Sequence, residues 1–200
     1  IFDRLVAQLQ REGGHLATPE QKEMLRKAMW DGERHRTVET VAIAPQALAK
    51  IAGFEIPADR KFIMVHGDGI GKEHHFSGEK LTTLLALYRY ESFDQALAMM
   101  RGVYEVGGKG HSCGIYSFDP DHIHRLAMAA PVSRIMVRQP QSKANAGAFN
   151  NGMPMTSSLG CGTWGGNIIS ENVHLKHYMN TTWVSVPIKE DKPSDEELFG

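Results

Sequence analysis

The chain is poor in the features that mark several large protein classes. Its 200 residues include only two cysteines, Cys113 and Cys161, too few for a disulfide framework, which favours a reducing, cytoplasmic setting. No apolar run approaches the roughly 20 residues that cross a bilayer. No basic region followed by an apolar stretch opens the chain either, so the sequence predicts neither a membrane span nor a signal peptide.

The chain also lacks an excess of charge of either sign. Lys and Arg number 22 against 23 Asp and Glu, a formal net charge of -1. A protein that binds the phosphate backbone needs clustered Lys and Arg, so no nucleic-acid partner is predicted. With 42% hydrophobic and 22% charged residues, the composition is that of a globular protein, and its length suffices for one domain with a sizeable core.

The first twelve residues have the pattern of a helix, since Phe2, Leu5, Val6 and Leu9 recur at helical spacing. A chain that lacks an initial Met and starts inside an amphipathic helix is expected to be part of a longer protein. A start or tag preceding Ile1 is the alternative.

Helical segments alternate with short apolar strands. Helices are expected at 1–12, 18–30, 46–52, 92–106, 122–130 and 171–179, and strands at 38–44, 61–66, 81–90, 111–117, 133–138 and 181–187. The clearest helix start is Thr18, with Pro19 at the first helical position and Gln21 completing a capping box. The alternation predicts an α/β fold of three layers, with a mostly parallel sheet flanked by helices. Residues 1–180 would form the main domain, and residues 181–200 a strand and polar tail.

Gly160 to Asn167 is the most unusual stretch, with four glycines in seven residues around Cys161 and Trp164. Glycines permit positive φ and close backbone approach, as in a loop that lines a pocket; a tight structural connection with a buried Trp is the alternative. A nucleophilic Cys161 would need an activating base, cation or helix N-terminus, and a small buried apolar residue is the more ordinary interpretation.

Ten histidines suggest metal binding, and three pairs stand close in sequence: His74/His75, His122/His124 and His174/His177. Adjacent residues on a strand face opposite ways, which argues against the first pair. His174 and His177 could face together, but no third ligand is in sequence reach, so no metal is predicted. Gly67 to Gly71 lacks the following helix of a phosphate-binding loop and is interpreted as a turn.

His111 and Glu79 each follow a glycine at the expected start of a strand. Such a place can aim an imidazole into a site as acid, base or hydrogen-bond donor. We expect both side chains to point into one cleft at the carboxyl ends of neighbouring strands, where α/β sheets bind ligands. A satisfied histidine and a surface glutamate are the alternatives.

Several motifs, taken in order, resemble one family. They are Gln46 to Pro57, Phe76 to Leu81, Gly107 to Ser112, Leu159 to Asn167, Ser170 to Val173 and Lys176-His177. Together they resemble the carboxy-terminal part of the catalytic domain of CoA-acylating aldehyde dehydrogenases, a group that includes the aldehyde domain of bifunctional acetaldehyde/alcohol dehydrogenases. The similarity covers nearly the whole chain.

The resemblance implies an enzyme that oxidises a short aldehyde through a thiohemiacetal on a cysteine, reduces NAD or NADP, and passes the acyl group to coenzyme A. Glu79 would then bind the nicotinamide ribose, and Leu81 takes the place of an aromatic residue that hydrolytic relatives set against the nicotinamide. His111 would polarise the thioester or assist deprotonation of the CoA thiol.

The chain departs from the family in one respect, because the family's nucleophilic cysteine would lie shortly before Ile1. Neither cysteine occupies that position, and no nucleotide-binding domain precedes it, so the isolated chain is expected to be inert. Two other functions stay open. One is an assembly module, since the family pairs the segment 181–187 with another subunit to form a homo-oligomer. The other is a hydrolase that uses Cys161.

Fewer residues in the sequence indicate which aldehyde is the substrate. Arg134 and Arg138 flank the expected strand 133–138 and could hold a carboxylate or sulfonate on the aldehyde; solvated strand-end charges are the alternative. The tail, at 182–185 and 193–200, resembles acylating sulfoacetaldehyde dehydrogenases, and acetaldehyde or another short aldehyde is the alternative. The residues expected to line the substrate pocket are Cys161, Thr163, Trp164 and Arg134.

Overall fold

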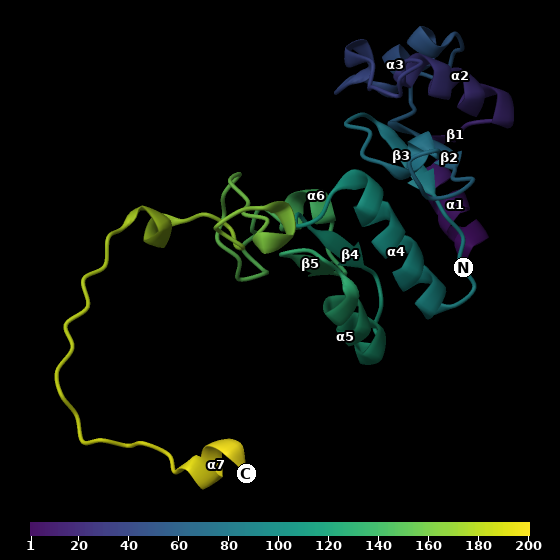
Figure 1. The fold of residues 1–200 in the computed structure, drawn as a ribbon. Helices are drawn as coiled ribbons and strands as arrows, with labels where there is room; N and C mark the ends of the chain where they lie inside the picture. The colour runs from purple at the N-terminus through teal and green to yellow at the C-terminus, as the bar shows by residue number, and fades with distance from the viewer.

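The computed structural model describes residues 1–200 and contains two small parallel sheets (Figure 1). The first has the strand order β1 (Gly14–Leu16), β2 (Phe62–His66), β3 (Leu84–Leu87). The second pairs β4 (Cys113–Ile115) with β5 (Ile135–Val137). Every pairing is parallel, as the sequence predicted, because helices connect most successive strands and return the chain to the same edge.

Helices cover both faces of the first sheet, which gives the predicted three layers. Along β2, Ile63 and Val65 pack with α2 (Pro19–Met29) and α3 (Pro45–Ala52) in one fully buried core. Met64 points to the opposite face, as alternation along a strand requires, and packs against Val6 of α1 (Phe2–Arg11). Burying each such aliphatic side chain stabilises the fold by about 1.5–3 kcal/mol.

The start of α2 has the geometry that the sequence predicted. The Thr18 hydroxyl accepts a hydrogen bond from the Gln21 amide at 3.2 Å, and the Gln21 side chain accepts one from the Thr18 amide at 3.1 Å. These two bonds satisfy donors that a helix terminus otherwise leaves free. Gly53 ends α3 with φ +93°, a conformation that glycine adopts without strain.

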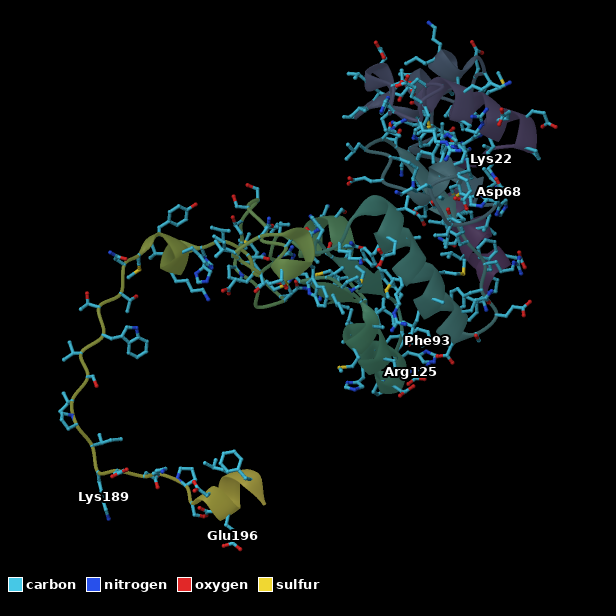
Figure 2. All side chains as sticks on the ribbon, in the orientation of Figure 1. Lys22, Asp68, Phe93, Arg125, Lys189 and Glu196 are labelled. Carbon is cyan, nitrogen blue, oxygen red and sulfur yellow. The ribbon has the colours of Figure 1, made fainter.

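The second unit consists of β4 and β5 with α4 (Phe93–Gly107), α5 (Pro120–Ala129) and the short α6 (Gln141–Ala144). Its buried cluster is small: Leu97, Leu126 and Ala130. At the outer end of α4, Phe93 and Arg125 lie together (Figure 2): the Arg125 guanidinium lies 5.3 Å from the Phe93 ring centre and pairs with Asp94.

Beyond α6 the chain has little regular structure. It contains the 3₁₀ turns η3 (Thr163–Gly165) and η4 (Leu175–Tyr178) and ends in α7 (Asp195–Phe199). All residues from 181 to 200 are exposed, and the segment runs away from the body of the molecule (Figures 1 and 2). No helix in the structure is both long enough and apolar enough to span a membrane.

Several predicted elements differ from the structure. The expected strand 38–44 is wrong, because the chain there forms the 3₁₀ turn η1 (Val38–Thr40) and then turns back at Ala42, with φ +54°; its β-branched residues found no partner strand. Residues 181–187, which were expected to pair with another subunit, pair with no strand of this chain. The expected helix 171–179 is reduced to η4. Strand β1 and the turn η2 (His75–Ser77) were not predicted. Each has only three residues, too few to show a hydrophobic periodicity.

Candidate active site

A cleft of about 720 Å³ lies between the two sheets, and both Glu79 and His111 line it. Its walls come from the turn before β3, the outer side of β3, the end of α4 and the first residues of α6. The sequence predicted that these two side chains would share a cleft, and the structure brings them to one, although they are far apart along the chain.

The predicted place of that cleft is wrong in two respects. Glu79 lies in the loop before β3, and His111 immediately precedes β4, so both are at the amino ends of their strands rather than the carboxyl ends. The strands are also not neighbours, since they belong to different sheets. A residue that opens a strand lies at the amino end of that strand. Because β3 belongs to the first sheet and β4 to the second, the site lies where the two sheets meet.

His111 is held from three sides. Its Nδ1 lies 2.7 Å from the Ser112 hydroxyl, and its carbonyl oxygen accepts a hydrogen bond from Arg134 at 3.0 Å. Preceding it, Gly110 has φ +104° and packs so closely on the glycine-rich loop that an added Cβ would lie 2.7 Å from the Cβ of Cys161. Position 110 therefore requires glycine, because the backbone adopts a positive φ there and a second backbone segment leaves no room for a Cβ.

On the opposite wall, Glu79 is exposed and makes no hydrogen bond or ion pair within the chain. The next residue, Lys80, donates to the carbonyl oxygens of Phe76 and Gly78 at 3.0 and 2.8 Å. Burial lowers the pKa of Lys80 to about 8, with a further contribution from the Arg36 charge. Lys80 was not predicted from the sequence, although it stands next to Glu79 in the motif Phe76 to Leu81.

Leu81 follows in a strained conformation, with φ +47°, and its side chain is 58% exposed. Its carbonyl accepts a hydrogen bond from the Ala42 amide at 2.8 Å, which fixes the turn. A branched residue at positive φ is uncommon and persists only where neighbouring structure holds it. The result is an apolar side chain presented to the outside next to Glu79, though not in the lining of the cleft.

The glycine-rich loop does not line this cleft. Thr163 and Trp164 are exposed, so the alternative of a buried Trp is wrong. Cys161 is half-buried, and the only hydrogen-bond contact of its sulfur is with the Leu159 carbonyl, at 4.0 Å. No histidine, carboxylate or lysine bonds to that sulfur, so the structure offers nothing to activate it as the hydrolase alternative requires.

Arg134 is buried, which rules out the interpretation as a solvated strand end. Its Nε and Nη1 have no hydrogen-bond partner in the chain, and it lines a separate cavity of about 300 Å³ together with Ser133 and Asn172. Arg138 does not join it there: its guanidinium donates to the Ser117 carbonyl at 2.7 Å and lies over the Phe118 ring. The two arginines therefore do not form one anion site.

A third ligand does lie near the last histidine pair, since atoms of Glu171, His174 and His177 fall within 4.8 Å of one another. Their contacts are nonetheless accounted for within the chain. The Nδ1 of His177 accepts from the His174 amide at 3.0 Å, and the Glu171 carboxylate pairs with Lys176 at 2.6 Å and with His177 at 3.4 Å. The cluster is an ion-pair network at η4.

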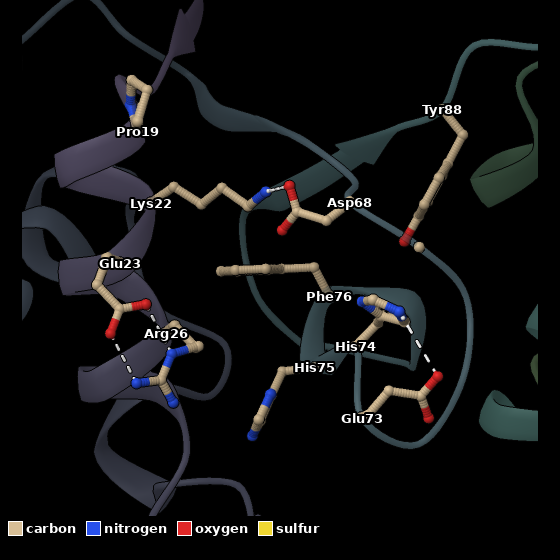
Figure 3. A pocket seen from close by; sticks show the side chains of 11 residues that line it. Pro19, Lys22, Glu23, Arg26, Asp68, Glu73, His74, His75, Phe76 and Tyr88 are labelled. Carbon is tan, nitrogen blue, oxygen red and sulfur yellow. Dashed lines mark hydrogen bonds and ion pairs between the residues drawn. The ribbon is translucent and has the colours of Figure 1, made fainter.

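A second hollow of about 270 Å³ lies at the carboxyl ends of β2 and β3, beside α2 (Figure 3). Two ion pairs lie in it, Lys22 with Asp68 at 2.5 Å and Arg26 with Glu23 at 2.7 Å, and the His74 ring lies 3.5 Å from the Glu73 carboxylate. Asp68 belongs to the stretch Gly67 to Gly71, a loop without secondary structure whose Gly71 carbonyl accepts a hydrogen bond from the Ser77 hydroxyl. Lys22 and Arg26 are both paired, so neither is free to attract an anionic ligand.

No family model matches the chain, but individual proteins do. Sulfoacetaldehyde dehydrogenase from Acholeplasma sp is 40% identical over 204 residues, covering 100% of this chain and 42% of the relative. The acylating sulfoacetaldehyde dehydrogenase of Bilophila wadsworthia is 35% identical, covering 100% and 44%. The crystal structure of an acetylating aldehyde dehydrogenase from Geobacillus thermoglucosidasius superimposes with a TM-score of 0.87 at 32% identity, over 96% of this chain and 42% of that one. The chain thus spans about two fifths of the length of the relatives it matches.

Proposed function

The chain is homologous over its whole length to acylating aldehyde dehydrogenases, and from this relationship we propose that it serves the oxidation of a short aldehyde to an acyl-CoA thioester. In that reaction an aldehyde, a CoA thiol and an oxidised nicotinamide cofactor yield the thioester, the reduced cofactor and a proton. The observation that supports the proposal most is the convergence of Glu79 and His111 on one cleft. A free carboxylate and an imidazole are then available at one reaction site.

The cofactor would be NAD or NADP, and the residues on the Glu79 wall fit it. The unpaired Glu79 carboxylate can accept hydrogen bonds from ribose hydroxyls. The exposed Leu81 side chain next to it offers an apolar surface for a flat ring. When bound, the nicotinamide accepts the hydride; these residues of the chain bind and orient it.

The nucleophile would come from outside residues 1–200. Cys113 is half-buried beneath Tyr104, and burial raises the pKa of its thiol, which disfavours the reactive thiolate. Cys161 has no base in contact. Both cysteines are free thiols, which fits the cytoplasmic location that we propose for the protein.

The substrate would be a small anionic aldehyde, with sulfoacetaldehyde as the first candidate. Two of the relatives are named for that aldehyde. In this chain the buried Arg134 leaves two guanidinium nitrogens unpaired beside a cavity, and a sulfonate or carboxylate is the group that would satisfy them. Acetaldehyde, which carries no charge, is the alternative substrate.

A second function, assembly, is favoured by the segment 181–188. Its apolar side chains are exposed in this chain: Trp183, Val184, Val186 and Ile188 are each at least 72% exposed. An extended apolar segment with free backbone groups is a ready partner for a sheet edge. We propose that it pairs with another copy of the protein in a homo-oligomer.

Activity assays can test the proposal. The longer protein that contains this chain should reduce NAD or NADP in the presence of CoA and sulfoacetaldehyde, with a lower KM than for acetaldehyde. The isolated 200-residue chain should show no turnover, because it has no activated thiol. Turnover by the isolated chain that disappears in Cys161→Ala, but not in the matched Cys113→Ala, would overturn the proposal and favour the hydrolase-type nucleophile.

A further inference from the structure

The His111 ring makes one polar contact with another side chain. The groups around that second side chain determine which ring nitrogen of His111 carries the proton. The contact joins His111 Nδ1 to the Ser112 hydroxyl oxygen at 2.7 Å. Ser112 is buried beneath it, whereas the other ring nitrogen, Nε2, has no partner in the chain. Either nitrogen of a neutral imidazole can hold the proton, so the distance alone leaves the tautomer open.

The Gln141 side chain resolves the direction of the neighbouring bonds. Its Nε2 lies 3.0 Å from the Ser112 carbonyl oxygen and 2.9 Å from the Ser112 hydroxyl oxygen. A carbonyl oxygen can only accept, so the group that faces it must be the amide NH₂ rather than the amide oxygen. The same NH₂ group therefore donates to the Ser112 hydroxyl as well.

The Ser112 hydroxyl then has one place to send its own proton. Apart from His111, the side-chain atoms around it are the donors of Gln141 and, at 3.5 Å, of Asn145. Among side chains at normal hydrogen-bond distance from the hydroxyl, His111 Nδ1 is the one that can accept, since Gln141 donates and the Asn145 amide lies 3.5 Å away. If Nδ1 were protonated instead, the buried hydroxyl would hold a donor without a partner, an arrangement that folded proteins avoid.

We propose that Ser112 and Gln141 are positioning residues that fix neutral His111 as the tautomer with its proton on Nε2, so that the ring presents a hydrogen-bond donor to the cleft. This inference rests on the proposed function and narrows it. A neutral ring with Nε2–H facing the cleft can donate to the carbonyl oxygen of an acyl thioester, but it has no lone pair there to take the proton of a thiol. His111 would thus polarise the acyl group.

Nuclear magnetic resonance of the ¹⁵N-labelled chain can test this directly. At about pH 8.5 an unperturbed imidazole is neutral, and long-range ¹H–¹⁵N correlations distinguish the protonated ring nitrogen from the unprotonated one. Signals of His111 are identified by their loss in His111→Asn. We expect the chain to show Nε2 protonated and Nδ1 unprotonated.

A free imidazole already favours the Nε2–H tautomer, so this tautomer in the unmodified chain does not by itself show that Ser112 and Gln141 fix it. Variants of these two residues supply that evidence. In Gln141→Glu a carboxylate faces the hydroxyl and accepts a hydrogen bond from it, so Nδ1 should become the donor to the hydroxyl oxygen and the Nε2–H pattern should be lost. Ser112→Ala should give a mixture of tautomers. Ser142→Ala, a neighbour on α6 without a bond to this network, should leave the pattern unchanged.

An Nδ1–H pattern in the unmodified chain would overturn the proposal. So would an unchanged tautomer in Gln141→Glu when the backbone amide spectrum shows the native fold. The measurement uses no substrate, so a missing aldehyde dehydrogenase activity would not affect its outcome, and an unexpected tautomer would leave the proposed activity standing.

Discussion

The two sheets of the molecule are built differently, although both are parallel and both are joined by helices. Around the first sheet, ten buried residues form one core, and Leu25, Met29, Leu48, Ile63 and Val65 have no exposure at all. Around the second, the buried cluster has three residues, each still 7–8% exposed. Partly buried apolar side chains pack around this cluster, and buried polar residues lie beside it, as at Ser112, Arg134 and Asn145. The first unit thus has a closed apolar core, whereas the second has a smaller one with polar residues buried near the candidate site.

Truncating one leucine in each unit tests this difference and should give the largest effect on stability. We expect Leu48→Ala to lower the free energy of unfolding by about 2–5 kcal/mol, because it leaves a cavity in a closed core. Leu97→Ala should cost less, near the low end of that range, because solvent can reach its site. Urea unfolding monitored by circular dichroism gives both values. Equal losses of free energy would contradict the proposed difference between the two cores.

The pH dependence of stability should reveal Lys80, the buried amine at the edge of the first unit. Its folded pKa, about 8, lies below the ordinary lysine pKa of 10.5, so the unfolded chain binds more protons between these two values. Stability should therefore rise with pH across that window, by about 2–3 kcal/mol. Lys80→Met should remove this rise.

Lys50→Met is the matched control, since Lys50 is exposed on α3. It should keep the pH dependence of the unmodified chain. A Lys80→Met chain whose stability still rises between about pH 8 and 10.5 would mean that another group is responsible.

The tail should have the smallest effect on the stability of the chain and a larger one on its association. Deleting residues 181–200 removes no buried residue, so the free energy of unfolding should change by less than about 0.5 kcal/mol. Sedimentation at micromolar concentration should show association of the full chain and loss of that association in the deletion. A monomer in both cases would contradict the assembly role.

The sequence predicted elements correctly where local rules decide them, and failed where pairing with a distant segment decides. The capping box at Thr18 and the apolar run of β2 depend on nearby residues alone, and both were confirmed. The 3₁₀ turn at Val38–Thr40 was mistaken for a strand, because its β-branched residues were expected to find a partner that the fold does not provide.

The candidate site could likewise be predicted only in part from the sequence. The glycines before Glu79 and His111 marked where side chains could be presented, and the two residues do share a cleft. Burial of Arg134 and the contact between Ser112 and Gln141 could not be predicted, because they join residues more than twenty positions apart through the packing of β4, β5 and α6. The Cys161 loop was expected in the pocket and instead packs behind Gly110.

We propose that Glu79 and His111 act at one site of an acylating aldehyde dehydrogenase, and steady-state kinetics of a longer protein containing this chain would test this. Glu79→Gln should raise the KM for NAD or NADP about tenfold or more, whereas His111→Asn should lower kcat for acyl-CoA formation by about 10²–10⁴. Glu73→Gln, an exposed carboxylate outside this cleft, is the control and should leave both values unchanged. Kinetics of Glu79→Gln and His111→Asn that match the unmodified enzyme would contradict the account.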